Sequence, residues 1–134
     1  MDRFELDWER VADEAAAFIR ERMAAARRDM IVIGLSGGID SAVSAFLAVR
    51  ALGLEKLAAF TLPYRTSSQQ SLDDARSVVE ALGVAHELIE ITPMVDAYFG
   101  LYPDASRLRR ANMMARQRMT VLYDQSERLN ALVI

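Results

Sequence analysis

The sequence contains no cysteine, a single histidine and a single lysine. Without cysteine there are no disulfides, no thiolate metal sites and no cysteine nucleophile. His86 has no partner that the sequence reveals, so we interpret it as an ordinary histidine entering a strand. This interpretation argues against a catalytic histidine dyad or a histidine-rich metal site. Lys56 follows a predicted helix in a loop, where a buried catalytic lysine is not expected.

Charge and hydropathy exclude two further classes of function. The 134 residues carry a formal net charge of −3, and this lack of basic excess argues against a nucleic-acid partner. No apolar run approaches the roughly 18 residues that a membrane-spanning helix needs. Residues 2–7 are acidic and lack the layout of a signal peptide, so a cytoplasmic protein is expected. The length predicts one domain, over residues 1–134, with one core.

Strands and helices alternate in the predicted secondary structure. Apolar spacing predicts a helix over residues 7–28 with Asp7 as its N-cap, and a long helix over residues 105–129. Two further helices are expected to end near Gly53 and Gly83, the second opening with a capping box at residues 71–74. Strands are predicted at residues 30–35, 57–62, 87–91 and 131–134. The pattern predicts an α/β fold with a Rossmann-like, doubly wound parallel sheet.

The sequence ends on the last predicted strand. A parallel strand with nothing after it has neither a carboxyl-end loop nor a covering helix. We therefore expect a domain truncated after its fourth strand. The alternative is a small complete domain in which this strand pairs at an edge of the sheet.

The most informative segment is the glycine turn between the first strand and the following helix. Backbone N–H groups converge on an anion at such a turn, and two hydroxyls and one carboxylate would surround it here. A purely structural turn is the alternative, but it does not require hydroxyls at both ends and an acid inside. The candidate phosphate-binding residues are Gly34, Leu35, Ser36, Gly37, Gly38, Ile39, Asp40 and Ser41. The segment has neither the Walker A ending nor a GxGxxG pattern.

This segment resembles the PP-loop of the N-type ATP pyrophosphatases, which cleave ATP between its α and β phosphates. The resemblance implies that the loop backbone and the hydroxyls of Ser36 and Ser41 hold the leaving pyrophosphate. It also implies that Asp40 binds a Mg²⁺ ion, which offsets the charge that develops there. ATP and Mg²⁺ are thus the expected co-substrate and cofactor.

Two more segments resemble the NAD synthetase family. Residues 62–68 resemble its second-strand loop, where the adenosine part of ATP lies, which makes Leu62 and Ser67 candidate ATP contacts. Residues 112–123 resemble its Asn-x-x-Ala-Arg-x-Arg-Met helix, in which the positions matching Asn112 and Arg116 contact deamido-NAD. These two residues share a helix face. Beside them we expect a packed apolar stripe, made of Leu108, Ala111, Ala115, Met119 and Leu122.

We interpret several other side chains of this region as having no role in ligand binding. We interpret Arg107, Arg109 and Arg110 as solvated charges, and the methionines Met113, Met114 and Met119 as core or subunit contacts. Whether Tyr98, Phe99 and Tyr102 stack on a base or pack in the core stays open from sequence alone.

The resemblance covers about the first half of a typical family member, and it implies amidation of deamido-NAD with ATP and ammonia. It also implies a homodimer formed through the long helix. Because the sequence has no cysteine and starts directly with its first helix, free ammonia, or ammonia from a separate partner, is expected. The 134 residues alone are expected to be inactive. The alternatives are another PP-loop ligase, such as a tRNA-modifying one, and a non-catalytic nucleotide-binding module.

Overall fold

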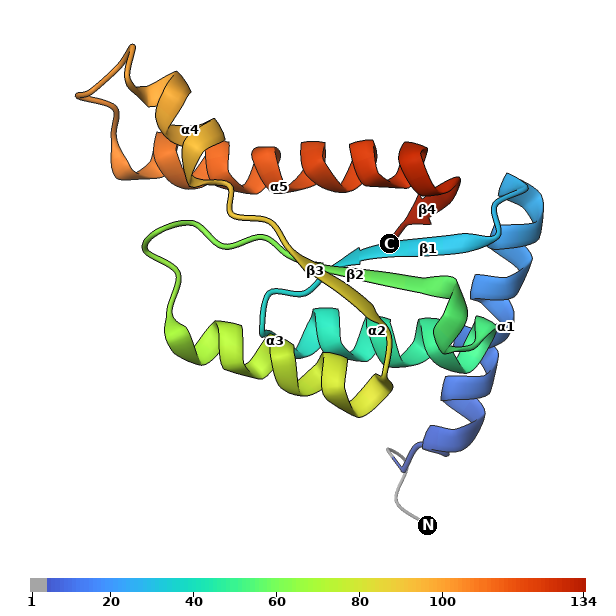
Figure 1. Cartoon of the computed structure of the whole chain (residues 1–134). Helices are drawn as coiled ribbons and strands as arrows, with labels where there is room; N and C mark the ends of the chain where they lie inside the picture. Colours follow the sequence, from blue (N-terminus) through green and yellow to red (C-terminus); the bar gives the residue numbers. More distant parts are fainter. Residues whose placement is uncertain (1–4) are drawn as a thin grey trace.

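A four-stranded parallel sheet forms the centre of the molecule, whose computed structural model describes residues 5–134. The strands are β1 (Met30–Gly34), β2 (Leu57–Thr61), β3 (Ala85–Leu88) and β4 (Ala131–Val133), in the order β3-β2-β1-β4 (Figure 1). Residues Ile31 and Val32 of β1 pair with Leu57 and Ala58 of β2 on one side and with β4 on the other.

Helices cover both faces of this sheet. Helices α1 (Trp8–Ala26), α2 (Ile39–Leu52) and α3 (Gln69–Leu82) lie on one side, and α4 (Thr92–Phe99) and α5 (Arg107–Leu129) lie on the other (Figure 1). The chain therefore leaves β1 along one face and enters β4 from the opposite face. The predicted Rossmann-like, doubly wound parallel sheet is confirmed.

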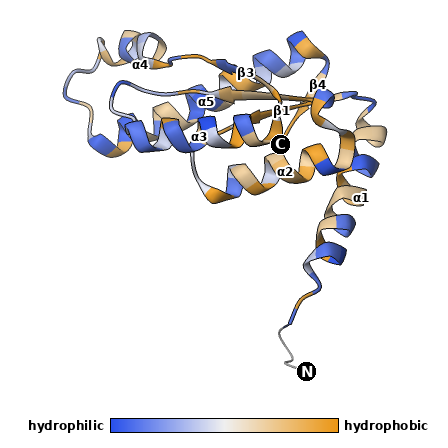
Figure 2. Cartoon of the chain, turned by 60° about the horizontal axis from the view of Figure 1, so that its bottom comes forward, coloured by the Kyte–Doolittle hydropathy of each residue, from blue (hydrophilic) through white to orange (hydrophobic). Residues whose placement is uncertain are grey.

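Strand alternation divides the core into two clusters. Ile31 and Ile33 pack toward α1–α3, whereas Val32 and Phe60 pack toward α4 and α5. All residues of β2 are buried, and Figure 2 shows β1 in apolar colours between helices with hydrophilic outer faces. The two central strands, β1 and β2, are thus buried and near-continuously apolar, as expected for a parallel sheet covered on both sides.

The helix ends follow local chemistry. Asp7 caps α1 by accepting a hydrogen bond from the Arg10 backbone N–H at 3.2 Å, as predicted. Gly53 follows α2, and Gly83 closes α3 in a left-handed conformation with φ +68°. Ser106 caps α5 through the Arg109 N–H. A short 3₁₀ turn, η1 (Leu54–Lys56), leads into β2.

Two predicted element boundaries are wrong. Helix α3 begins at Gln69, before the predicted capping box, because the Ser68 hydroxyl accepts the Ser71 N–H and caps the helix. The third strand lies at Ala85–Leu88 instead of residues 87–91, since its register is determined by pairing with β2. It is an exposed edge strand, and its apolar residue Leu88 is 53% exposed.

Helix α5 turns a different face to the core than the predicted stripe. Leu108 and Met119 are 71% and 50% exposed, whereas Met113, Met114 and Val121 pack against the sheet. Both sides of this helix carry apolar residues, so periodicity did not distinguish them. Of the five stripe residues, Leu122 alone packs against this cluster, and the remaining apolar side stays uncovered beside Asn112 and Arg116.

Among residues 5–134, no helix has the length and apolar character needed to cross a membrane. The prediction about a signal peptide involves residues 2–7, of which residues 2–4 lie outside the described part of the chain.

Candidate active site

The turn between β1 and α2 brings the predicted phosphate-binding residues together. After Gly34, the Leu35 N–H donates to the Phe60 carbonyl at 2.8 Å and extends the pairing of β1 with β2. Within residues 5–134, no side chain caps α2, whose N-cap is Gly38. The N–H groups of its first turn therefore lack a side-chain partner at the end of the helix that favours negative charge.

Hydroxyl groups organise this turn from within. Ser36 and Ser41 place their Oγ atoms 3.3 Å apart, and the Gly38 N–H donates to Ser36 Oγ at 3.2 Å. The Ser41 hydroxyl donates to the Gly38 carbonyl at 3.2 Å. Asp40 lies in the first turn of α2 and is exposed. The turn thus presents two hydroxyls and one carboxylate around a helix N-terminus, an arrangement suited to phosphate with a metal ion.

Gly37 brings this turn into close contact with α3. Its φ is +82°, and a Cβ atom built on it would lie 2.5 Å from the carbonyl oxygen of Ser71. A side chain at this position would overlap backbone, so only glycine fits. The N-terminal end of α3 therefore lies directly against the turn.

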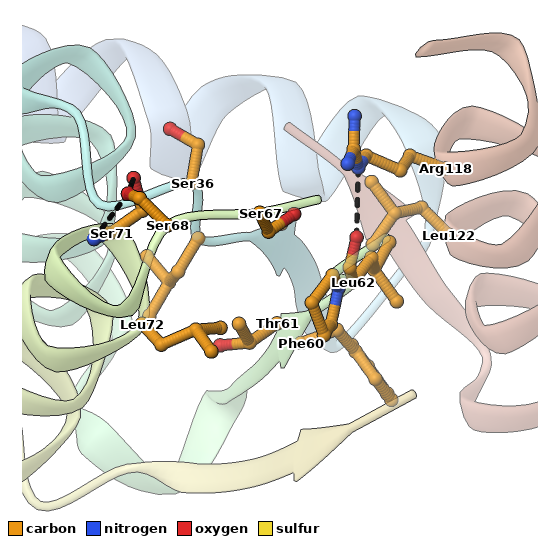
Figure 3. A pocket seen from close by; sticks show the side chains of 13 residues that line it. Ser36, Phe60, Thr61, Leu62, Ser67, Ser68, Ser71, Leu72, Arg118 and Leu122 are labelled. Carbon is orange, nitrogen blue, oxygen red and sulfur yellow. Dashed lines mark hydrogen bonds between the residues drawn. The ribbon is translucent and has the colours of Figure 1, made fainter. Parts of the chain in front are cut away.

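A pocket of about 390 Å³ opens beside the turn, at the carboxyl ends of β1 and β2. Figure 3 shows Ser36, Ser68 and Ser71 on one side, with Arg118 and Leu122 of α5 on the other. The lining residues are Gly34, Leu35, Ser36, Phe60, Thr61, Leu62, Pro63, Ser67, Ser68, Ser71, Leu72, Arg118 and Leu122. Apolar walls with several hydroxyls at one end suit a nucleoside joined to phosphates.

Arg118 is a lining residue that sequence reasoning left unassigned. Its Nε donates to the Leu62 carbonyl at 2.8 Å, and burial lowers the pKa of its guanidinium, which stays charged at neutral pH (Figure 3). Arg116 and Arg118 lie two positions apart and so point to different sides of α5. Arg118 lies one helical turn before the buried Val121, but the sequence alone did not show which side of α5 is buried.

The structure separates the two predicted groups of ligand-binding residues. Leu62 and Ser67 line the pocket together with part of the glycine turn. Asn112 and Arg116 lie on the exposed side of α5 and are not among the lining residues. The Arg116 guanidinium donates weakly to the Asn112 carbonyl at 3.4 Å. Their predicted contacts with deamido-NAD would therefore lie outside this pocket.

Asp40 stands apart from other candidate metal ligands. Among the described residues, no group of three histidine, aspartate or glutamate side chains could hold a metal ion. Mg²⁺ is commonly bound through one or two carboxylates plus substrate phosphates. An exposed carboxylate beside the candidate phosphate-binding turn fits this mode, in which Asp40 would be the protein ligand and a nucleotide would supply the other oxygens.

His86, predicted to lie at the entrance to the third strand, lies within β3, and it has a partner that the sequence did not reveal. Its Nε2 lies 2.7 Å from Oγ1 of Thr61, a pocket residue. Burial lowers the pKa of His86, with a smaller contribution from the positive charge of Arg76. The neutral ring therefore forms a polar contact with β2.

Of the aromatic residues of α4 and the following loop, Phe99 packs in the core, Tyr98 and Tyr102 stay partly exposed, and none lines the pocket. Phe99 is buried, with the Tyr98 ring at 5.2 Å from it in an edge-on arrangement. Arg110 lies over the Phe99 ring and donates to the Pro103 carbonyl at 2.9 Å. Arg109 lies over Tyr102. Arg109 and Arg110 thus stabilise this loop, a structural role that the prediction of solvated charges did not include.

The sequence model of the family described as NAD synthase matches residues 11–134. The chain belongs to this family. It is 54% identical over 117 residues to an NH₃-dependent NAD⁺ synthetase of Chlorobaculum tepidum, covering 87% of this chain and 42% of the relative. The chain spans about half the length of the curated relatives it matches. The predicted resemblance to the first half of family members is confirmed.

Solved structures agree with this family assignment. The NH₃-dependent NAD synthetase of Campylobacter jejuni superposes with a TM-score of 0.90 at 35% identity, over 96% of this chain and 56% of that protein. A glutamine-dependent NAD⁺ synthetase of Acinetobacter baumannii, solved with ADP, gives a TM-score of 0.89 at 30% identity, over 96% of this chain and 25% of that protein. Both of these solved relatives are NAD synthetases.

Proposed function

We propose that this chain is the ATP-binding half of an ammonia-dependent NAD synthetase. The observation that carries the proposal is the uncapped glycine turn at α2, which opens beside a pocket of nucleoside size. In the proposed reaction, the nicotinate carboxylate of deamido-NAD attacks the α-phosphorus of ATP and pyrophosphate leaves. Ammonia then attacks the acyl-adenylate, giving NAD⁺ and AMP.

Different parts of the pocket contact the adenosine and the phosphates of ATP in this proposal. Leu62, Phe60 and Leu122 provide apolar surface for the adenosine part, and Ser67 provides a hydroxyl. The turn around Ser36 and Ser41 holds the β and γ phosphates. These two phosphates leave together as pyrophosphate when their bond to the α-phosphorus breaks. The ADP found in the Acinetobacter baumannii relative supports a nucleotide in this family. Because no nucleophilic side chain is needed, the rate acceleration comes from positioning the two substrates and stabilising the charge that develops on the leaving pyrophosphate.

Asp40 is the proposed protein ligand of Mg²⁺. A bound Mg²⁺ ion supplies positive charge that neutralises the leaving pyrophosphate. Asp40 is positioned for this by its place in the first turn of α2, four residues after Ser36. The turn itself contributes neutral N–H and O–H donors, so a cation is needed to balance the charge of a triphosphate.

Asn112 and Arg116 are the proposed contacts of deamido-NAD, and they face outward from α5. The exposed apolar residues Leu108, Met119 and Tyr123 lie on the same helix, and they support a homodimer formed through it. Deamido-NAD would then bind near the contact between the two copies. The reaction uses small soluble substrates, and we propose a cytoplasmic location.

Titration of the chain with ATP tests nucleotide binding, and a pyrophosphate-release assay tests the reaction. The second assay uses a polypeptide that carries this chain together with the other half found in its relatives. We expect release only with ATP, deamido-NAD and ammonia present. ATP binding with no pyrophosphate release under any of these conditions would favour the alternative of a non-catalytic nucleotide-binding module.

A variant of Arg116 separates substrate binding from ATP binding. We expect Arg116→Ala to raise the KM for deamido-NAD about tenfold with little change in the KM for ATP, since one charge-assisted contact is lost. Arg107→Ala removes an exposed charge from the same helix and serves as the control. Equal effects of the two substitutions would contradict the role of Arg116.

A further inference from the structure

The segment between β2 and α3 forms one wall of the pocket. It contains a tight turn in which the Ser67 N–H donates to the Tyr64 carbonyl at 2.8 Å. The Tyr64 N–H donates back to Ser67 Oγ at 3.0 Å. Ser67 and Ser68 line the pocket, so the shape of this wall depends on where the turn is held.

Helix α4 holds the turn from the side away from the pocket. Tyr64 is only 7% exposed, and its hydroxyl donates to Oδ1 of Asp96 at 2.5 Å. The Arg65 guanidinium donates to Oδ2 of the same carboxylate and, at 3.0 Å, to the Tyr64 hydroxyl. The Arg65 N–H donates to Thr92 Oγ1 at 2.8 Å. Both oxygens of one carboxylate therefore anchor two consecutive residues of the turn.

The other end of the turn leads directly to the phosphate-binding residues. Ser68 caps α3 by accepting the Ser71 N–H at 3.1 Å. The Ser71 carbonyl is the atom that lies against Gly37. A shift of the turn would therefore move the pocket hydroxyls and the end of α3 relative to the glycine turn.

We infer that Asp96 is a positioning residue for the nucleotide pocket, acting through Tyr64 and Arg65. Asp96 is not among the pocket-lining residues, so its effect on a nucleotide is transmitted by the turn it holds. Its carboxylate is paired and hydrogen-bonded on both oxygens. The inference rests on the proposed function for its ligand, ATP, and assigns to α4 a role in ATP binding.

The test compares Asp96→Asn and Tyr64→Phe with a matched control. Asp13→Asn removes a carboxylate that pairs with Arg50 at 2.8 Å and links α1 to α2, away from the pocket. For each variant the ATP dissociation constant is measured by calorimetry at a temperature where the protein is folded. Amide hydrogen exchange at Ser67 reports the order of the turn without nucleotide.

For Tyr64→Phe we expect about tenfold weaker ATP binding and faster Ser67 exchange, because a hydrogen bond to a carboxylate is lost. Asp96→Asn is expected to have a comparable effect, and the double variant little more than either one, since both break one linkage. Asp13→Asn is expected to lower thermal stability while leaving the ATP dissociation constant unchanged.

Unchanged ATP affinity in both Asp96→Asn and Tyr64→Phe would overturn the inference, even with lowered thermal stability. Failure of the unaltered chain to bind ATP would instead refute the proposed function. In that case Ser67 exchange decides: acceleration in Asp96→Asn but not in Asp13→Asn supports the positioning role, and equal exchange rates overturn it.

Discussion

Gly37→Ala tests the close approach between the glycine turn and α3. The backbone there has φ +82°, and the added Cβ would lie 2.5 Å from the Ser71 carbonyl oxygen and 2.9 Å from its Cα. Both neighbours are backbone atoms, so a side-chain rotation cannot relieve the overlap. The substitution therefore has to displace the turn from the end of α3.

The magnitude follows from a strain contribution and a packing contribution. A left-handed conformation costs a non-glycine residue roughly 1–2 kcal/mol. Overpacking against backbone adds about 1–3 kcal/mol. We thus expect Gly37→Ala to lower the free energy of unfolding by about 2–5 kcal/mol and to abolish measurable ATP binding.

Gly83→Ala is the matched control for this prediction. Gly83 also has a positive φ, +68°, but no atom lies within 4 Å of the Cβ position. In Gly83→Ala we expect only the strain contribution, which lowers the free energy of unfolding by about 1–2 kcal/mol, and normal ATP binding. Urea unfolding and calorimetry with ATP measure both quantities. Equal destabilisation and equal ATP affinity of the two variants would refute the close approach.

Three further predictions concern charged groups around the site. Asp40→Asn should weaken ATP binding about tenfold with Mg²⁺ present but not in a chelator; equal weakening in both conditions would contradict the metal role. Arg118→Met keeps the apolar stem but removes the donor to Leu62, so calorimetry should show several-fold weaker ATP binding, whereas no change would make Arg118 a packing residue only. The pKa of Asp96 is lowered by the Tyr64 hydroxyl and then by Arg65 and Arg110, so this carboxylate stabilises the fold above its ordinary pKa, and that stability is lost as pH falls through the lowered value. The difference in thermal midpoint between the chain and Asp96→Asn should therefore shrink below about pH 4, and a constant difference would refute this linkage.

Local patterns were sufficient to predict most elements of the fold. The helix over α1 with its Asp7 cap, the strand–turn–helix around Gly37 and the long helix α5 all depend on residues near each other in sequence. One error lies where distant pairing decides, since the register of β3 is determined by β2. The other arises from a local competition, in which Ser68 caps α3 three residues before the predicted serine.

The candidate site divides in the same way. The glycine turn with its two hydroxyls and one carboxylate could be predicted because its residues are contiguous in sequence. Arg118 and Asp96 could not, because their partners Leu62 and Tyr64 are 56 and 32 residues away. The role of each became visible only when α4 and α5 were placed against the end of β2.

The sequence by itself determined the α/β class, the family and the location of the glycine turn between β1 and α2, since these depend on local composition and contiguous motifs. The tertiary structure decided which side of α5 meets the core and which arginine faces the pocket. That decision depends on packing, because α5 carries apolar residues on two sides and only the sheet selects between them. It left Asn112 and Arg116 facing outward, where the proposed second copy would meet them.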